Sequence, residues 1–152
     1  MTETFDRVWL YQKIVEESPI AILCADREGK IRLWNSGAEA MFGYRAEEVL
    51  GKSMDLIIPE NLRARHWEGW VGVIASGVTK YGRDALAVPA IRKDGSRISI
   101  EFNILLLSAP TGEVLGAAAT IQDVTARWKQ QKELKSRIVA LEAKVAERGG
   151  AG

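Results

Sequence analysis

The sequence predicts an α+β fold in which one antiparallel sheet of five strands carries helices on one face. Five stretches have the length and the apolar or alternating pattern of strands. Apart from a leading helix and a helical tail, the helical patterns fall between the second and third of these strands. The pair Asp94-Gly95 joins two of the later strands as a tight hairpin.

Composition limits the classes of function. The 152 residues, 47% of them hydrophobic, can bury one core, and 21 Lys and Arg nearly balance 20 Asp and Glu. The lone Cys24 cannot form an internal disulfide, and no apolar run reaches the roughly 18 residues of a membrane span. We therefore expect a cytoplasmic protein that binds neither nucleic acid nor membrane directly.

The first elements are a helix and two strands. Apolar residues at helical spacing predict a leading helix over residues 5–17, which Ser18-Pro19 ends. Residues 20–25 form a continuous apolar run, and residues 30–34 alternate between polar and apolar. The segment 26–29, which ends in a glycine, predicts a tight turn between the two strands.

Short helices follow the second strand. Asn35-Ser36 can cap a helix that Gly43 ends, and one more helical turn follows before Gly51. The longest helical pattern of this region covers residues 59–76, between a proline suited to a first turn and Gly77. The only histidine, His66, lies on the apolar stripe of that helix, so we expect its side chain to face inward.

Three strands complete the sheet. Residues 85–92 contain Pro89, which favours an edge strand or a bulge. Residues 97–104 alternate strictly, so that one face of this strand is apolar, and residues 114–124 form the last strand.

The tail from residue 126 to 148 predicts a long helix that ends at Gly149-Gly150. Its apolar residues recur at spacings of four, three and four, as the a and d positions of a coiled coil do. These seam residues are Leu134, Ile138, Leu141 and Val145. A parallel homodimer is the expected result, with the leading helix at the same interface; the alternative is a helix folded back on its own sheet.

Several stretches together resemble the PAS domain, a family of sensory and dimerisation modules. They are the first strand with Asp26 and Gly29, residues 34–44, the turn at 47–51, residues 92–96 and residues 123–125. The resemblance implies domain limits of 18–125, with a cap helix over 1–17, a signalling helix over 126–148 and a flexible tail over 149–152. It also implies the strand order 2-1-5-4-3, a small-molecule pocket between the sheet and the 59–76 helix, and no enzymatic activity.

Residues 58–66 are similar to the segment that bears the proximal heme ligand in bacterial oxygen-sensing PAS proteins. This resemblance implies heme b held by His66 as the iron ligand. The pocket residues it implies are Leu62, Trp70, Lys80, Arg83, Leu86, Ile98, Ile100 and Ile104. Heme sensors also place an arginine or methionine on the strand before the hairpin, where residues 84–87 have neither.

Other interpretations of the pocket stay open. It can hold an organic ligand, or Trp67, Trp70 and Phe102 can fill it in an unliganded interaction module. His66 is then an ordinary polar residue of a helix. Flavin–cysteine photochemistry is not expected, because Cys24 lies on the first strand and not on the helix that would face a flavin. One histidine and one cysteine also make a poor zinc site.

The segment 123–125 links the last strand to the tail. The PAS resemblance implies that Asp123 and Thr125 relay the state of the pocket to the helix, and either side chain can also cap it. The sequence shows no output domain after the tail. We therefore expect either a fragment of a kinase, a cyclase or a regulator, as in bacterial two-component or transcriptional control, or a stand-alone module that acts on such a downstream partner.

Overall fold

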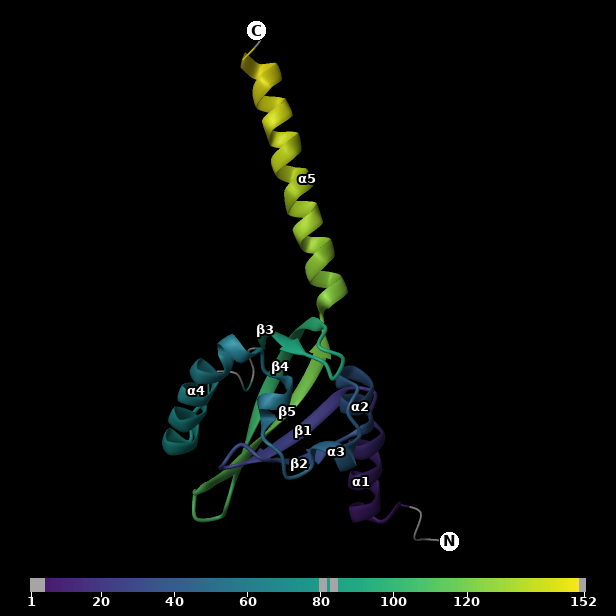
Figure 1. Ribbon diagram of the computed structural model, residues 1–152, viewed down its shortest axis with the longest axis vertical. Coiled ribbons are helices and arrows are strands. Elements are labelled where there is room, and N and C mark those ends of the chain that lie inside the picture. Colours follow the sequence, from purple (N-terminus) through teal and green to yellow (C-terminus); the bar gives the residue numbers. More distant parts are fainter. Residues whose placement is uncertain (1–4, 80–81, 83–84, 151–152) are drawn as a thin grey trace.

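A computed structural model describes residues 5–79, 82 and 85–150. The chain forms one sheet with helices beside it, and a long C-terminal helix extends away from the sheet (Figure 1). In chain order the elements are α1 Arg7–Glu17, β1 Ala21–Asp26, β2 Ile31–Trp34, α2 Ser36–Phe42, α3 Ala46–Val49, the 3-10 helices η2 Met54–Ile57 and η3 Glu60–Leu62, α4 Arg63–Ser76, β3 Leu86–Ile91, β4 Arg97–Ser108, β5 Val114–Asp123 and α5 Thr125–Gly150.

The predicted fold class is confirmed. The sheet has five antiparallel strands in the order β2-β1-β5-β4-β3. Strand β3 lies at an edge, which explains how it accommodates Pro89, a residue without a backbone donor. Gly95 closes the predicted β3–β4 hairpin with a φ of 85°, a left-handed conformation that glycine adopts without strain.

The two faces of the sheet differ. The inner face carries Leu23, Ile98, Ile100 and Ile121, which are buried together with Phe42 from α2 and further residues of α3 and η2. The outer face carries the alternate residues of β1, β4 and β5, and none of the helices that the structure describes lies across it (Figure 1). Because strand side chains alternate between faces, every residue of the central strands can be assigned to one of the two.

Four predicted boundaries were wrong by two residues or more. Helix α1 begins at Arg7 and not at residue 5, because Asp6 caps it. Helix α4 begins at Arg63 and not at Pro59, because the Arg63 guanidinium donates to the carbonyls of Asp55 and Ile58 and a 3-10 turn precedes it. Strand β4 continues past residue 104 to Ser108, because β5 pairs with it from Ile100 to Ser108. Helix α5 runs through Gly150, since a glycine costs a helix only about 1 kcal/mol and does not block it sterically.

Helix α5 projects from the end of β5 into solvent (Figure 1). None of its residues is buried, and Leu134, Ile138, Leu141 and Val145 are each more than half exposed. The alternative in which this helix folds back on its own sheet was therefore wrong. Among the helices of residues 5–79 and 85–150, none is long and apolar enough to cross a membrane.

One buried polar side chain joins three elements. Asn35 is 3% exposed, and its Oδ1 accepts from the backbone N–H groups of Ile22 in β1 and Ala38 in α2. Its Nδ2 donates to the carbonyls of Val15 in α1 and Ile20 before β1, at 2.8 and 2.9 Å. The amide therefore caps α2, as predicted, and also fixes the end of α1 beside the sheet.

Replacing Asn35 by Ala should lower the free energy of unfolding by about 3 kcal/mol, because the cap is lost and buried N–H and C=O groups lose their partner. Asn35→Asp keeps the capping oxygen but turns a second oxygen toward the carbonyls, so it should destabilise about as much. Urea denaturation measures both. The control Asn61→Ala removes an exposed amide and should change stability by less than about 0.5 kcal/mol. A loss below about 1 kcal/mol for both Asn35 variants would contradict this role.

Candidate functional site

Helix α4 is held beside the sheet by polar contacts. The Trp67 indole donates from Nε1 to Oδ1 of Asp55 at 2.7 Å, and the Trp70 indole donates to the carbonyl of Arg27 in the β1–β2 turn at 2.9 Å. Both indoles also pack against the hydrophobic core. None of the residues of α4 is fully buried. The helix is therefore anchored at a few points over the edge of the core.

His66 lies between the two tryptophans. Its ring stands edge-on to Trp67 at a centroid distance of 4.7 Å and is nearly parallel to Trp70 at 6.3 Å. Its Nδ1 is buried without a hydrogen-bond partner among the described residues. Burial lowers the pKa of His66 below its ordinary value, although the nearby Asp55 carboxylate opposes this shift. The imidazole is therefore neutral at pH 7 and keeps a free lone pair.

The half-buried ring agrees with the expectation that His66 faces inward. A buried polar atom without a partner costs free energy, so native structures rarely leave one unexplained. A neutral imidazole with an unused nitrogen has the chemistry of a metal or heme ligand. In the part of the chain that the structure describes, no three His, Cys, Asp or Glu side chains gather as a closed metal site would require.

The other predicted pocket residues form an apolar wall beside α4. Ile98 and Ile100 are buried on the inner face of β4, and Ile104 and Leu86 are half-buried on the same face. Leu62 and Trp70 are half-buried at the start and middle of α4. Lys80 and Arg83 lie outside the described residues. The sheet residues and those of α4 therefore border the same side of the sheet.

Sequence reasoning missed the partners that position the tryptophans. Trp67 packs so closely on Gly29 that a β-carbon there would lie 2.1 Å from the indole. Gly29 also has a φ of 79°, so both the backbone conformation and the closeness of Trp67 require a glycine at this position. The sequence indicated a turn at this place, but no local pattern connects it with Asp55 or with a tryptophan 38 residues later.

The link between sheet and tail has a defined geometry. Oδ1 of Asp123 accepts from the backbone N–H of Thr125 at 2.9 Å and from its hydroxyl at 2.5 Å. The Thr125 hydroxyl oxygen in turn accepts from the backbone N–H of Ser99 in β4 at 2.9 Å. The first turn of α5 is therefore attached to β4 and β5 through the two residues that the sequence singled out.

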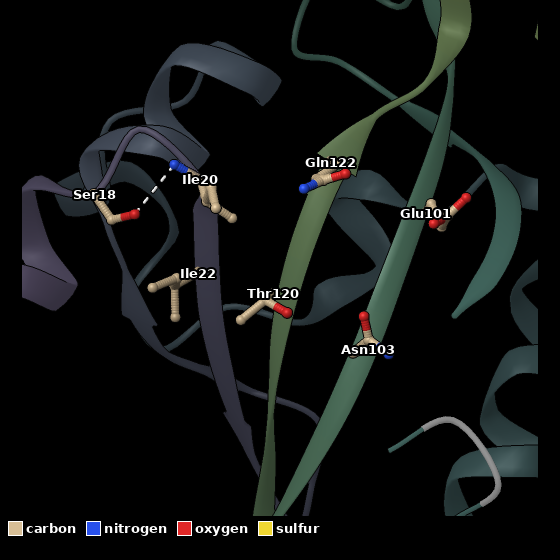
Figure 2. Close-up of a pocket in the computed structure, with 7 residues that line it drawn as sticks. All are labelled: Ser18, Ile20, Ile22, Glu101, Asn103, Thr120 and Gln122. Atoms are coloured by element: carbon tan, nitrogen blue, oxygen red, sulfur yellow. Dashed lines mark hydrogen bonds between the residues drawn. The ribbon is translucent and has the colours of Figure 1, made fainter. Parts of the chain in front are cut away.

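A pocket lies on the outer face of the sheet, away from α4. It has a volume of about 410 Å³ and is lined by residues of β1, β4 and β5 and of the segment before β1 (Figure 2). These are Ser18, Ile20, Ile22, Glu101, Asn103, Thr120 and Gln122. No local pattern in the sequence predicts this pocket, because its residues are brought together only by the strand order.

Comparison with known proteins agrees with this fold. A family model described as the PAS fold matches residues 15–129. The crystal structure of a PAS domain from Colwellia psychrerythraea superimposes with a TM-score of 0.70 at 21% identity, covering 80% of this chain and 99% of that one. That likeness concerns the fold alone.

Two curated relatives are signalling proteins. The oxygen sensor protein DosP of Escherichia coli is 26% identical over 128 residues, which is 84% of this chain and 16% of DosP. The cell-division control histidine kinase PdhS of Brucella anthropi is also 26% identical over 128 residues, 84% of this chain and 12% of PdhS. The chain thus spans less than a fifth of the length of either relative. Because the family match covers well over half of it, the chain belongs to the PAS family of sensory domains.

Proposed function

We propose that this PAS domain senses a small ligand held between the inner face of the sheet and α4, and reports it through α5 in a homodimer. The observation that carries the proposal is the buried Nδ1 of His66, which has no partner among the described residues. A ligand that contacts the imidazole would relieve the cost of burying this polar ring. PAS domains act by binding, so the proposal gives the chain no reaction of its own.

The most specific form of this proposal is that the bound molecule is heme b, with His66 as the residue that coordinates the iron. A neutral imidazole is a common axial ligand, and Ile98 and Ile100 offer the apolar surface that a porphyrin requires. The iron would supply reversible binding of a diatomic gas or a redox change. His66 would orient the group, and the apolar wall would keep water from it. The similarity to DosP, an oxygen sensor, supports this version.

A second candidate is an unliganded dimerisation and interaction module. Trp67, Trp70 and Phe102 pack against the hydrophobic core and so take up part of the space that a ligand would need. In this case α4 closes the domain, and the two indole hydrogen bonds hold it there permanently. An organic ligand smaller than heme would be compatible with a pocket that these side chains fill only in part.

The proposed output is a parallel coiled coil of two α5 helices. Leu134 and Leu141 fall at d positions, whereas the β-branched Ile138 and Val145 fall at a positions, the arrangement that favours two parallel strands. All four side chains are exposed in the single chain, and Ile138, Leu141 and Val145 border one surface hollow. Arg137 at a g position faces Glu142 at the following e position of a parallel partner, which adds charge complementarity.

In this proposal Asp123 and Thr125 carry the change from sheet to helix. Their hydrogen bonds tie the start of α5 to Ser99, which lies directly between the pocket residues Ile98 and Ile100. A ligand that shifts β4 would therefore move the first turn of α5. The downstream partner is a kinase, a cyclase or a regulator; the similarity to the histidine kinase PdhS supports the first of these.

Heme binding predicts a Soret band in the visible spectrum of the protein after addition of hemin. His66→Ala should remove or shift that band and weaken hemin binding by at least about tenfold, because the iron loses its axial ligand. The matched control is Arg65→Ala, an exposed neighbour on the same helix, which should bind hemin as the parent does. No band, or a band indifferent to His66→Ala, would exclude this version and leave the organic ligand or the unliganded module.

The dimer predicts that charges on the α5 seam abolish association. The double variant Leu134→Lys, Leu141→Lys should sediment as a monomer, because four lysines would meet in the seam of the dimer. Val139→Lys is the matched control: Val139 is exposed to 65%, lies on the same helix and falls outside the seam. It should remain dimeric. A dimer that survives the seam variant would locate the interface elsewhere.

A further inference from the structure

The two halves of α4 are attached to the domain in different ways. In the first half, Arg63 and Trp67 both donate to Asp55, which lies in η2 only 8 and 12 residues earlier in the chain. Among the described residues, the second half has a single polar contact with the sheet region. It is the hydrogen bond from the Trp70 indole to the carbonyl of Arg27, 43 residues away in the β1–β2 turn.

The second half of α4 has little helical preference of its own. Trp70 lies between Gly69 and Gly72, and glycine is the poorest helix former after proline. Most of the residues that follow Trp70 in the helix are β-branched, namely Val71, Val73 and Ile74. No residue of α4 is fully buried. A segment with so few buried contacts opens locally at a low cost in free energy.

Arg27 positions the carbonyl that accepts from Trp70. Its Nη1 donates to Oε1 of Glu113 at 2.7 Å and to the carbonyl of Val114 at 3.1 Å, where the chain turns from β4 into β5. Val114 also lies beside the end of α4, since a β-carbon on Gly77 would be 3.5 Å from its Cγ2. The β1–β2 turn, the β4–β5 turn and the end of α4 therefore meet at Arg27.

The second half of α4 borders the proposed ligand pocket. Trp70, Val73 and Ile74 are half-buried, whereas Val71 is 65% exposed, so the half-buried side chains face the sheet. His66 lies one turn before Trp70, and the two rings are nearly parallel at a centroid distance of 6.3 Å. Movement of this half away from the sheet would open a path from solvent to the imidazole.

We infer that Trp70 and Arg27 are positioning residues that hold the second half of α4 over the ligand pocket, so that breaking their hydrogen bond lets a ligand reach and leave His66. The inference rests on the proposed ligand-binding function. Arg27 acts through the helix and does not touch the ligand. Because a ligand enters and leaves through the same opening, a weaker contact should speed both steps and leave the binding equilibrium nearly unchanged.

Hydrogen exchange of the unliganded full chain, read by mass spectrometry, tests the contact itself. Trp70→Phe keeps an aromatic ring but removes the indole donor, so exchange in residues 71–76 should be at least about fivefold faster. Arg27→Ala should act in the same direction, by about threefold, because the carbonyl can then shift with its turn. Residues 63–68 should exchange as in the parent, because Asp55 still holds them.

Lys30→Ala is the matched control for the exchange measurement. It removes an exposed ion pair with Glu28 in the same turn and should leave exchange in α4 unchanged. Equal exchange of residues 71–76 in Trp70→Phe and the parent would overturn the inference. A rise that spreads evenly over the sheet would also overturn it, because the hydrogen bond would then serve general stability. Thermal unfolding of each variant checks that all are folded.

Stopped-flow mixing with hemin tests ligand access. Arg27→Ala should raise the association and dissociation rate constants by about threefold each, and their ratio, the Kd, should change by less than about twofold. Unchanged rate constants, or a raised Kd with an unchanged association rate, would overturn the inference. If hemin does not bind to the parent at all, the heme version of the proposed function fails, and the exchange measurement decides the inference by itself.

Discussion

The fold depends on the buried amide of Asn35. Its side chain holds the end of α1, the start of β1 and the start of α2 at one point, and both its oxygen and its nitrogen are used. Because the Asn35 side chain is almost fully buried, these hydrogen bonds take the place of those that it would make with water. The same contacts fix the segment Ser18 to Ile20, which forms the rim of the outer-face pocket. One side chain thus positions both the core and the rim of the outer-face pocket.

The two faces of the sheet carry different groups of functional residues. On the inner side, α4 is attached by its tryptophans and by Arg63, and His66 is left with an unused nitrogen. On the outer side, α1 and the sheet expose apolar residues, and the Glu101–Arg127 pair leads into α5. Strand β4 contributes to both sides, since Ile100 is buried on the inner face while Ser99 and Glu101 contact the first turn of α5. In the proposed function, β4 is therefore the direct route by which a ligand on the inner face would affect α5.

Local signals in the sequence predicted local features well. Asn35 as a helix cap, Gly43 as a helix end and Pro89 on an edge strand were all confirmed, because each depends on backbone chemistry at one position. Strict alternation over 97–104 predicted the inner face of β4, but the run of leucines beyond it has no period, so the end of the strand at Ser108 was missed. The start of α4 was also missed, because the contacts of Arg63 with Asp55 and Ile58 depend on a turn that periodicity does not reveal.

The candidate sites were harder to predict than the local features, because their geometry depends on tertiary contacts. Resemblance and helical spacing singled out His66, Trp67 and Trp70, but not the stacking of the two indoles around the imidazole or the contact of Trp67 with Gly29. The outer-face pocket unites residues from 18 to 122, and the Arg127–Glu101 pair spans 26 residues. Neither has a sequence signal of its own, since both follow from the strand order that places β5 between β1 and β4.

The proposed function depends on the pairing of two copies along the seam of α5. Hydroxyl-radical footprinting read by mass spectrometry tests this pairing without altering the interface, by comparing the parent dimer with the protein diluted to monomer. We expect Leu134, Ile138 and Leu141 to be protected in the dimer, whereas Leu50 and Val71, which are exposed on the helical side of the sheet, should react equally in both states. Equal reactivity of the three seam residues in both states, or protection of Leu50 and Val71 instead, would contradict the proposed dimer.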